Sequence, residues 1–440
     1  MAAIGTHESA HPLNSKRNQI LLWILLILAA TEFVTRGPVR YLHHGNWDDL
    51  AQYYSSSRTW LRGENFADPN KFVAMWRDEV GSTLDPKTVR VHISPPPGAL
   101  VIFAPIAALP WPVAKAVWLF VLLASFAVTV WSLMKVARFS VHESRGIAFI
   151  AACLALAPFH TGIASANQTI FVVGCCAAGI WAADRKSDVW AGVLFGLACS
   201  LKPHIAVFLV LYYLLRGRWR LFGTAVALTV LLVAIAAAWM QFAGVHWLPD
   251  YLNNLRFAAA KNRVDDFTTA NAIRFTLINL QVPFYSFTHG ARSANLMAFS
   301  VGTALIVAWG VLVFRTRAEN FELLALAAIA VIGLLPLYHR FYDASILAIP
   351  LCWCLSRPEH QRRMANVALV VMLPFLVPGA TVLQEEARLG RIPEFVTHSW
   401  WWDRVLMPHQ TWFLLLLSLV LLFGMTREIQ AQQRKTASSG

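Results

Sequence analysis

The chain is poor in charge and in cysteine. Only 14% of its residues are charged, whereas soluble domains average about 25%. Its six cysteines all lie within apolar runs, so the sequence indicates neither a disulfide framework nor a cysteine-ligated metal centre; they are Cys153, Cys175, Cys176, Cys199, Cys352 and Cys354. No polar stretch is long enough to form a separate soluble domain. An ordinary soluble enzyme is therefore excluded.

Motifs for nucleotide and metal chemistry are also missing. The sequence has no Walker loop, no Rossmann glycine set and no G-x-S-x-G elbow. His43 and His44 are adjacent and lack the helical i, i+4 spacing of a metal site. The pI is about 9.8, but the basic residues are scattered between apolar runs, which is typical of membrane topology rather than of nucleic-acid binding. We predict no metal, no cofactor and no nucleic-acid partner.

What the chain has is apolar sequence. Hydrophobic residues make up 57% of it, and runs long enough to cross a bilayer recur from Gln19 to Met425. The first run follows Lys16 and Arg17 without a clear small-residue cleavage site, so we interpret it as a start-transfer span rather than a signal peptide. We predict an all-α polytopic membrane protein, one domain over 1–440, with about twelve transmembrane helices at 19–35, 113–134, 146–163, 168–183, 189–201, 204–215, 221–243, 297–314, 321–337, 344–355, 364–382 and 409–425.

Charge distribution orients these spans. If the N-terminus is cytoplasmic, the short loops between spans that lie in the cytoplasm contain more basic than acidic residues, as in "RGRWR" (216–220). The proline-rich run 95–110 is too short for a crossing and is predicted to be a re-entrant or interfacial helix on the outer face. Three long outer segments result, 36–112, 244–296 and 383–408, and 426–440 is a cytoplasmic tail. The run 189–215 is either one span with Lys202 at mid-depth or a hairpin turning at Lys202; the charges favour the hairpin.

The first outer segment contains an acidic pair, Asp48 and Asp49, at the start of a predicted amphipathic helix. Each carboxylate would lie in the first turn, where the helix dipole favours the ionised form. Asp48 also suits the role of an N-cap, so a purely structural interpretation of the pair stays open.

Polar clusters occur at three further outer turns, "ASANQT" (164–169), "LKPH" (201–204) and "YHRFYD" (338–343). The ordinary interpretation of each is a solvated loop. That interpretation is weaker for 338–343, where a cation, an imidazole and a carboxylate occupy six residues at the membrane boundary. Within 251–277, predicted to be a helix on the bilayer surface or a cap over a groove, Asp265 and Asp266 form a second acidic pair. We expect this pair to bind Arg263 and keep it as a reserve candidate for a base.

In order and spacing, these motifs resemble the GT-C-fold glycosyltransferases that use polyprenyl-phosphate sugars. More narrowly, the chain resembles glycosyltransferase family 87, which includes polyprenol-phosphate-mannose-dependent mannosyltransferases. The matching stretches are Asp49-Leu50-x-x-Tyr53-Tyr54 with "LRGENFADP", then "SPPPGALVIFAPIAALPWPVAKAVW", "NQTIF" and "AGVLFGLACSLKPHIAVFLVLYYLLRGRW". The resemblance covers 19–355 and implies a GT-C-like bundle.

The resemblance implies that an acidic residue of the first outer loop is the catalytic base, which by position is Asp49, and that His339 assists near the phosphate. An acceptor hydroxyl must lose a proton as it attacks the anomeric carbon, and cations must stabilise the departing phosphate. One carboxylate suffices for direct displacement, so we expect inversion. The predicted substrate-binding residues are Asp48, Tyr53, Tyr54, Asn167, Gln168, Lys202, His204, Arg256, Arg340 and Asp343.

The expected partners are a polyprenyl-phosphate-linked sugar donor, a lipid or glycan acceptor and membrane lipids. The expected location is the inner membrane of a bacterial cell, with the active site on the periplasmic side. Two other functions stay open: a flippase for lipid-linked sugars, which would place polar residues within the spans, and a polysaccharide ligase, which would need a large, arginine-rich outer loop. The sequence leaves the sugar, the acceptor and the linkage undetermined.

Overall fold

A computed structural model describes residues 16–44, 47–81, 95–258, 260, 265–316, 321–356 and 361–439. Over these residues the chain is helical, and its extended pairing is limited to one isolated bridge between Leu277 and Arg340. The predicted all-α class is confirmed.

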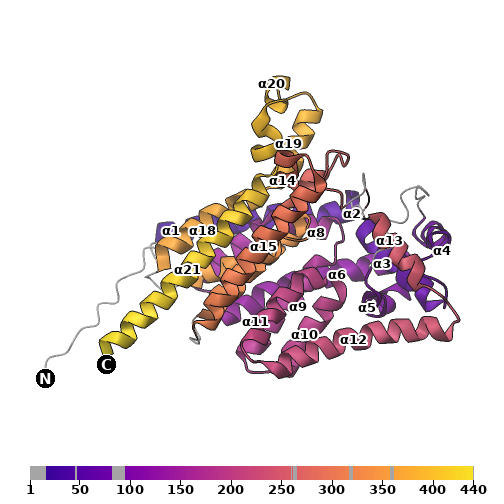
Figure 1. Cartoon of the computed structure of the whole chain (residues 1–440), viewed down its shortest axis with the longest axis horizontal. Helices are drawn as coiled ribbons and strands as arrows, with labels where there is room; N and C mark the ends of the chain where they lie inside the picture. Colours follow the sequence, from indigo (N-terminus) through magenta and orange to yellow (C-terminus); the bar gives the residue numbers. More distant parts are fainter. Residues whose placement is uncertain are drawn as a thin grey trace.

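Within the described residues, six helical stretches are long and apolar enough to cross a membrane, so the protein is polytopic. They are α1 Lys16–Val34 continuing into α2 Arg40–His44, α6 Trp111–Val136, α12 Trp219–Phe242, α15 Ala291–Phe314, α18 Arg362–Met372 continuing into α19 Gly379–Arg388, and α21 His409–Ser439. A seventh crossing forms if α7 Ser144–Ala155 and α8 Ala157–Ala164, bent by 46°, count as one broken span. Helices α15, α18 and α21 lie side by side in the bundle (Figure 1).

The remaining predicted spans are also helical, but they are short. They form α9 Thr169–Asp184, α10 Asp188–Leu201, α11 Pro203–Leu215, α16 Glu322–Gly333, and η7 Phe341–Leu347 followed by α17 Ala348–Ser356. Residues 324–333 are all buried, and an all-round apolar helix of this kind belongs to the centre of a bundle. Twelve full crossings are therefore not confirmed by helix length, although all twelve predicted segments are helices.

The segment 189–215 is a hairpin, as the charge distribution favoured. Pro203 opens α11 at a position where its missing N–H costs nothing, and it keeps Lys202 out of the helical region at φ −138°, ψ 79°. At the other end, Arg218 Nε donates to Asp188 at 2.8 Å and Arg218 Nη2 donates to the Ala183 carbonyl at 3.1 Å. Both helices therefore return to the end where α9 finishes, and Lys202 lies at the opposite tip.

The first outer segment forms α3 Asp48–Leu61, α4 Pro69–Met75 and the short helix α5 Pro97–Ala107, which packs against α3 and α12. The structure does not support the alternative interpretation of Asp48 as an N-cap, because the N-cap of α3 is Trp47 and its side chain makes no capping bond. Trp47 is held instead by its Nε1 bond to the Tyr41 carbonyl and by the Lys115 ammonium 3.9 Å from its ring centre. Asp48 and Asp49 thus both lie inside the first turn.

The large outer loop contains α13 Leu248–Ala258, η5 Arg274–Thr276 and α14 Gln281–Thr288. Helix α13 is fastened to the loop after α3, because Asn65 donates to Asp250 at 2.8 Å and Asn254 donates to the Ala67 carbonyl at 2.8 Å. Figure 1 shows α3, α4, α5 and α13 gathered at one end of the molecule. Leu248, Leu252 and Leu255 of α13 are exposed, so both predicted roles for this loop, a helix on the bilayer surface and a cap, stay predictions.

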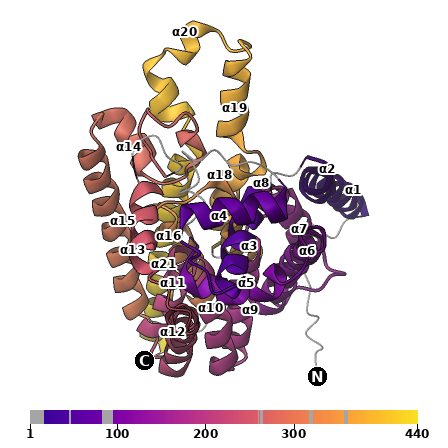
Figure 2. The same cartoon turned by 90° about the vertical axis from the view of Figure 1, so that its right-hand side faces the viewer.

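The last outer segment projects from the bundle. Helices α19 and α20 Glu394–Thr397 form this projection (Figure 2), which returns through the single turn Trp402–Leu406 to α21. Arg274 donates to Asp403 at 2.7 Å, so the projection is tied to the large outer loop.

Close packing of α10 on α12 generates the first prediction. A Cβ at buried Gly192 would lie 2.5 Å from Thr224 Cβ and 2.6 Å from the Leu221 carbonyl oxygen. Gly192→Ala should therefore destabilise the fold by about 1–3 kcal/mol, seen as a lower melting temperature in detergent. Gly310→Ala is the control, because nothing lies within 4 Å of its added Cβ, and it should melt at or above the parent temperature. Equal melting of the two variants would contradict this packing.

Candidate active site

Four chain segments meet at one end of the bundle. They are the first turn of α3 with Asp49, the turn before α9 with Asn167 to Thr169, the α10–α11 tip with Lys202, and the turn 338–343 before and within η7. Side-chain hydrogen bonds join the four segments to one another. Each of these turns is a short polar stretch between apolar helices. Its polar side chains can be buried because they form hydrogen bonds with side chains of another turn.

Asp49 is held by an amide. Asn167 Nδ2 donates to Asp49 Oδ2 at 2.7 Å, while the side-chain oxygen of Asn167 accepts from the backbone N–H of Thr169 at 2.9 Å. The Thr169 hydroxyl lies 2.7 Å from this oxygen and 2.7 Å from Asp343 Oδ1, and its single proton serves one of the two at a time. These bonds to Thr169 determine which end of the Asn167 amide faces Asp49. Burial raises the pKa of the Asp49 carboxyl, and Asn167 together with the charges of Arg340 and Lys202 opposes part of that rise. A carboxylate with a raised pKa is suited to accept a proton.

The buried centre of the cluster is an ion pair. Lys202 Nζ lies 2.8 Å from Asp343 Oδ1 and donates to the Thr169 hydroxyl at 2.6 Å. Both charged side chains are almost fully buried, with exposures of 7% and 0%. The second carboxylate oxygen of Asp343 accepts the backbone N–H of Arg340 at 2.9 Å. Both carboxylate oxygens of Asp343 therefore accept hydrogen bonds from other groups of the protein.

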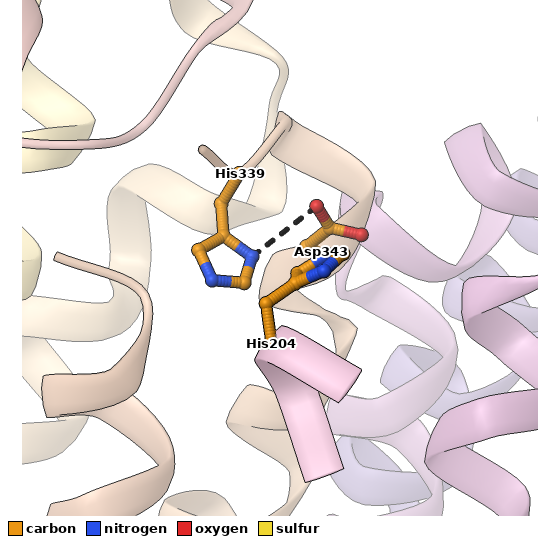
Figure 3. Close-up of side chains that lie close together, drawn as sticks. All are labelled: His204, His339 and Asp343. Atoms are coloured by element: carbon orange, nitrogen blue, oxygen red, sulfur yellow. Dashed lines mark ion pairs between the residues drawn. The ribbon is translucent and has the colours of Figure 1, made fainter. Parts of the chain in front are cut away.

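Two histidines lie beside this ion pair. His339 Nδ1 is 3.4 Å from Asp343 Oδ2, and the rings of His204 and His339 meet edge to face at a centroid distance of 4.8 Å (Figure 3). Among the described residues, Nε2 of His339 and Nε2 of His204 have no hydrogen-bond partner, whereas Nδ1 of His339 faces Asp343. Buried polar atoms of this kind are normally satisfied, so these nitrogens are available to a ligand.

His204, His339 and Asp343 also form the one grouping in the described part of the chain that offers three metal-ligand atoms, all within 4.8 Å of one another. The surroundings fit a metal poorly. The Lys202 ammonium already neutralises the same carboxylate, and a divalent cation beside it would meet like charge. We derive no step through a metal.

Arg340 completes the cluster. Its Nε donates to the Tyr338 hydroxyl at 2.6 Å, and its charge acts on Asp49. It is half-buried. A guanidinium at this position stays protonated at any physiological pH and presents several donors to an anion.

The structure gathers nine of the predicted site residues. They are Asp49, Tyr53, Asn167, Gln168, Lys202, His204, His339, Arg340 and Asp343. Two of these predicted substrate-binding residues contact other side chains of the cluster, because Asn167 bonds Asp49 and Gln168 donates to the Tyr53 hydroxyl at 2.7 Å.

Three predicted residues lie elsewhere. Tyr54 is fully buried and donates its hydroxyl to the Leu109 carbonyl at 2.8 Å, so it supports α5 and α6 rather than a sugar. Arg256 is exposed on α13, and no described hydrogen bond or ion pair links it to the cluster. Asp48 is exposed one residue before Asp49, whose pKa its charge raises.

Sequence reasoning missed Thr169 and Tyr338. Thr169 lies two residues after Asn167, the spacing at which an Asn side chain bonds the following backbone, and this was the available signal. Tyr338 is the first residue of the 338–343 motif. The expected pairing of Asp265 and Asp266 with Arg263 involves a residue outside the described part of the chain. Asp266 accepts from Thr268 at 2.8 and 2.9 Å, and burial raises the pKa of the Asp265 carboxyl.

Comparison with known families then identifies the chain. The model of glycosyltransferase family 87 matches residues 96–337. The chain belongs to glycosyltransferase family 87. No curated protein and no solved structure matches it. The matched region contains Asn167, Thr169 and Lys202, whereas Asp49 and His339 lie outside it, so only the geometry joins these two to the family's conserved span. Membership in this family makes the protein a glycosyltransferase and the cluster its candidate active site.

The second prediction tests the ion pair. Lys202→Met leaves Asp343 buried without its cation, which should lower the free energy of unfolding by about 3–5 kcal/mol, read as a fall in melting temperature. Adding Asp343→Asn should recover part of the loss. Lys71→Met is the control, because the Lys71–Glu64 pair is exposed and contributes little. An equal, small effect of both lysine substitutions would contradict the importance of the buried pair.

Proposed function

We propose that this family 87 enzyme transfers a hexose, with mannose as the first candidate, from a polyprenyl-phosphate donor to a hydroxyl of a lipid or glycan acceptor, with inversion. The observation that carries the proposal is the arrangement around Asp49: one carboxylate with a raised pKa, oriented by the Asn167 amide and adjacent to a cationic cluster. The family supplies the glycosyl transfer.

In the proposed step, an acceptor oxygen forms a bond to the anomeric carbon while Asp49 takes its proton. The bond between the anomeric carbon and the phosphate oxygen breaks, and the electron pair leaves with the polyprenyl phosphate. Arg340 is the cation for that developing charge, since the charge of Lys202 is already balanced by Asp343. Nε2 of His339 has no hydrogen-bond partner among the described residues, and it supplies a donor to a phosphate oxygen when it carries a proton.

Inversion follows from the number of available carboxylates. A retaining enzyme normally needs a second carboxylate as nucleophile. Asp343 is the other carboxylate of the cluster, and its oxygens bind Lys202, Thr169 and the Arg340 backbone. Its position inside this network removes it from direct attack on a sugar.

An apolar cavity near the site suits a lipid-linked donor. It has a volume of about 220 Å³, lies between α6, α9 and α10, and is lined by residues that include Phe120, Phe171 and Leu194. Phe171 is on the first turn of α9, two residues after Thr169. We propose that this cavity receives part of the prenyl chain while the phosphate lies at the polar cluster.

The orientation that we propose puts the site on the extracytoplasmic face. Arg218 and Asp188 lie at the end of the α10–α11 hairpin opposite Lys202. The basic loops 184–188 and 216–220 are therefore on the far side from the site, and basic loops face the cytoplasm. This orientation exposes the active site to polyprenyl-phosphate sugars of the outer leaflet.

The third prediction separates the two adjacent carboxylates. Asp49→Asn should reduce transfer from polyprenyl-phosphate [14C]mannose by about 10²–10⁴-fold, because the general base is lost, at equal protein level in the membrane. Asp48→Asn should retain most of the transfer, since Asp48 is exposed. Transfer is measured as radiolabel moved to endogenous acceptor in membranes.

Other outcomes revise specific parts of the proposal. Loss of transfer with Asp48→Asn instead would assign the base to Asp48. Full transfer by both variants would contradict a base in the first outer segment. Label moved only from other polyprenyl-phosphate sugars would replace mannose, and label moved only from a lipid diphosphate would favour the ligase.

A further inference from the structure

A lysine in the second turn of α6 is held between two tryptophan rings. The Lys115 ammonium lies 3.9 Å from the ring centre of Trp47 and 5.7 Å from the ring centre of Trp111, which is one helical turn before it. No carboxylate or hydrogen-bond acceptor of a described residue binds this ammonium. Lys115 thus differs from Lys202, whose charge is balanced by Asp343.

Contacts around this lysine fix its position relative to α3, the helix whose first turn carries the candidate base. The Tyr41 hydroxyl donates to the Lys115 carbonyl at 2.8 Å, and Trp47 Nε1 donates to the Tyr41 carbonyl at 3.1 Å. Trp47 is the N-cap of α3. Trp111 packs edge to face against Tyr54 of the same helix at a centroid distance of 5.1 Å. The two rings that hold the ammonium are therefore both attached to α3.

Aromatic rings hold a cation without neutralising it. The quadrupole of the ring attracts the ammonium, but the ring has no net charge. A lysine side chain is flexible, and its ammonium has three N–H donors. An ammonium held in one place without a carboxylate keeps its positive charge and its donors available to an anion, and a phosphate accepts such charge-assisted hydrogen bonds. Lys115 is half-buried, so it is not sealed off from a ligand.

The surroundings of Lys115 indicate that this anion belongs to a lipid. Helix α6 is long and apolar enough to cross the membrane, and Lys115 lies one turn inside its outer end in the proposed orientation. Val113 and Phe120 of the same helix are exposed apolar side chains, which contact hydrocarbon in a spanning helix. Tryptophan is enriched at the membrane–water interface, where the phosphates of lipid headgroups lie.

We propose that Lys115, held by Trp47 and Trp111, binds the phosphate of an anionic lipid at a site separate from the donor phosphate at Arg340. Binding at this site requires no turnover, so the inference goes beyond the proposed function and does not depend on it. Two lipids share this chemistry, because each carries its phosphate at headgroup level: a lipid of the bilayer, and an acceptor lipid that presents a hydroxyl to Asp49.

The experiment measures the affinity of the purified full-length protein in detergent for phosphatidylglycerol, with zwitterionic phosphatidylcholine as the comparison, by native mass spectrometry of the lipid-bound protein. The compared substitutions are Lys115→Met, Lys115→Arg and Trp47→Leu. Arg292→Met is the control, because Arg292 is an exposed cation in the first turn of the spanning helix α15. Melting temperatures recorded with each protein show that it is folded.

We expect Lys115→Met to lower the affinity for phosphatidylglycerol about tenfold, the size of one hydrogen bond between charged groups. Lys115→Arg should restore most of the affinity, because a guanidinium keeps the charge and also stacks on aromatic rings. Trp47→Leu should lower the affinity although the net charge is unchanged, since the ammonium is no longer held; an effect of net charge alone would not give this result. Arg292→Met should bind as the parent does.

Equal affinity of the parent and Lys115→Met for phosphatidylglycerol would overturn the site. Displacement of the lipid by inorganic phosphate would make a soluble anion the occupant and overturn the lipid. If Lys115→Met also loses polyprenyl-phosphate mannose, Lys115 belongs to the donor site and a second site is wrong.

Two further results leave the site in place and say what it serves. Radiolabel transferred from polyprenyl-phosphate [14C]mannose to the bound lipid would make that lipid the acceptor, whereas equal binding without label would make it a lipid of the bilayer. If the parent binds phosphatidylglycerol through Lys115 but does not bind the donor, the donor class of the proposed function is wrong and the lipid site stands.

Discussion

The buried pair between Lys202 and Asp343 is the interaction on which the site depends. It joins the tip of the α10–α11 hairpin to the turn before α17, positions 141 residues apart in the chain, and it includes Thr169 at the start of α9. Without the lysine, a carboxylate would remain in the apolar interior at a cost of several kcal/mol. Because both charges are almost fully buried, three helix ends must stay together for either to be satisfied.

This pair also explains why so many polar residues of the cluster bind one another. Thr169 contacts both Lys202 and Asn167, and Asn167 in turn orients Asp49. Such a network keeps the reacting carboxylate in one geometry before any substrate arrives, which is the general condition for electrostatic catalysis. In the described part of the chain, the groups left for a ligand then include Nε2 of His339 and Nε2 of His204, which have no hydrogen-bond partner.

The three predicted outer segments contact one another and are linked to this network. The loop after α3 and helix α13 are fastened together by Asn65 and Asn254, and the large loop that contains α13 also pairs with the turn that carries His339. The projecting α19–α20 segment joins it through Arg274 and Asp403. Elements that a hydropathy profile treats as separate loops therefore form one continuous cover connected to the candidate active site.

The sequence by itself determined the helices, because the length of an apolar run and the positions of its prolines influence the backbone near them in the chain. It predicted all twelve helical segments, the α10–α11 hairpin and the polar turns from which the site is built. It left the cap of α3 open, and the structure places Trp47 there, in contact with Lys115. Helix length does not confirm twelve crossings, because helices such as α16 are too short to cross a membrane alone and are buried among neighbouring helices.

Only the tertiary structure decided what each polar residue binds. Asn167 and Asp49 are 118 positions apart, and no local pattern states which turns will meet. Tyr54 and Tyr53 are neighbours on one helix, yet one supports Leu109 and the other faces Gln168. The physical reason is the same in each case: a side-chain hydrogen bond depends on which helix ends pack together, and that packing depends on the whole apolar surface of the chain.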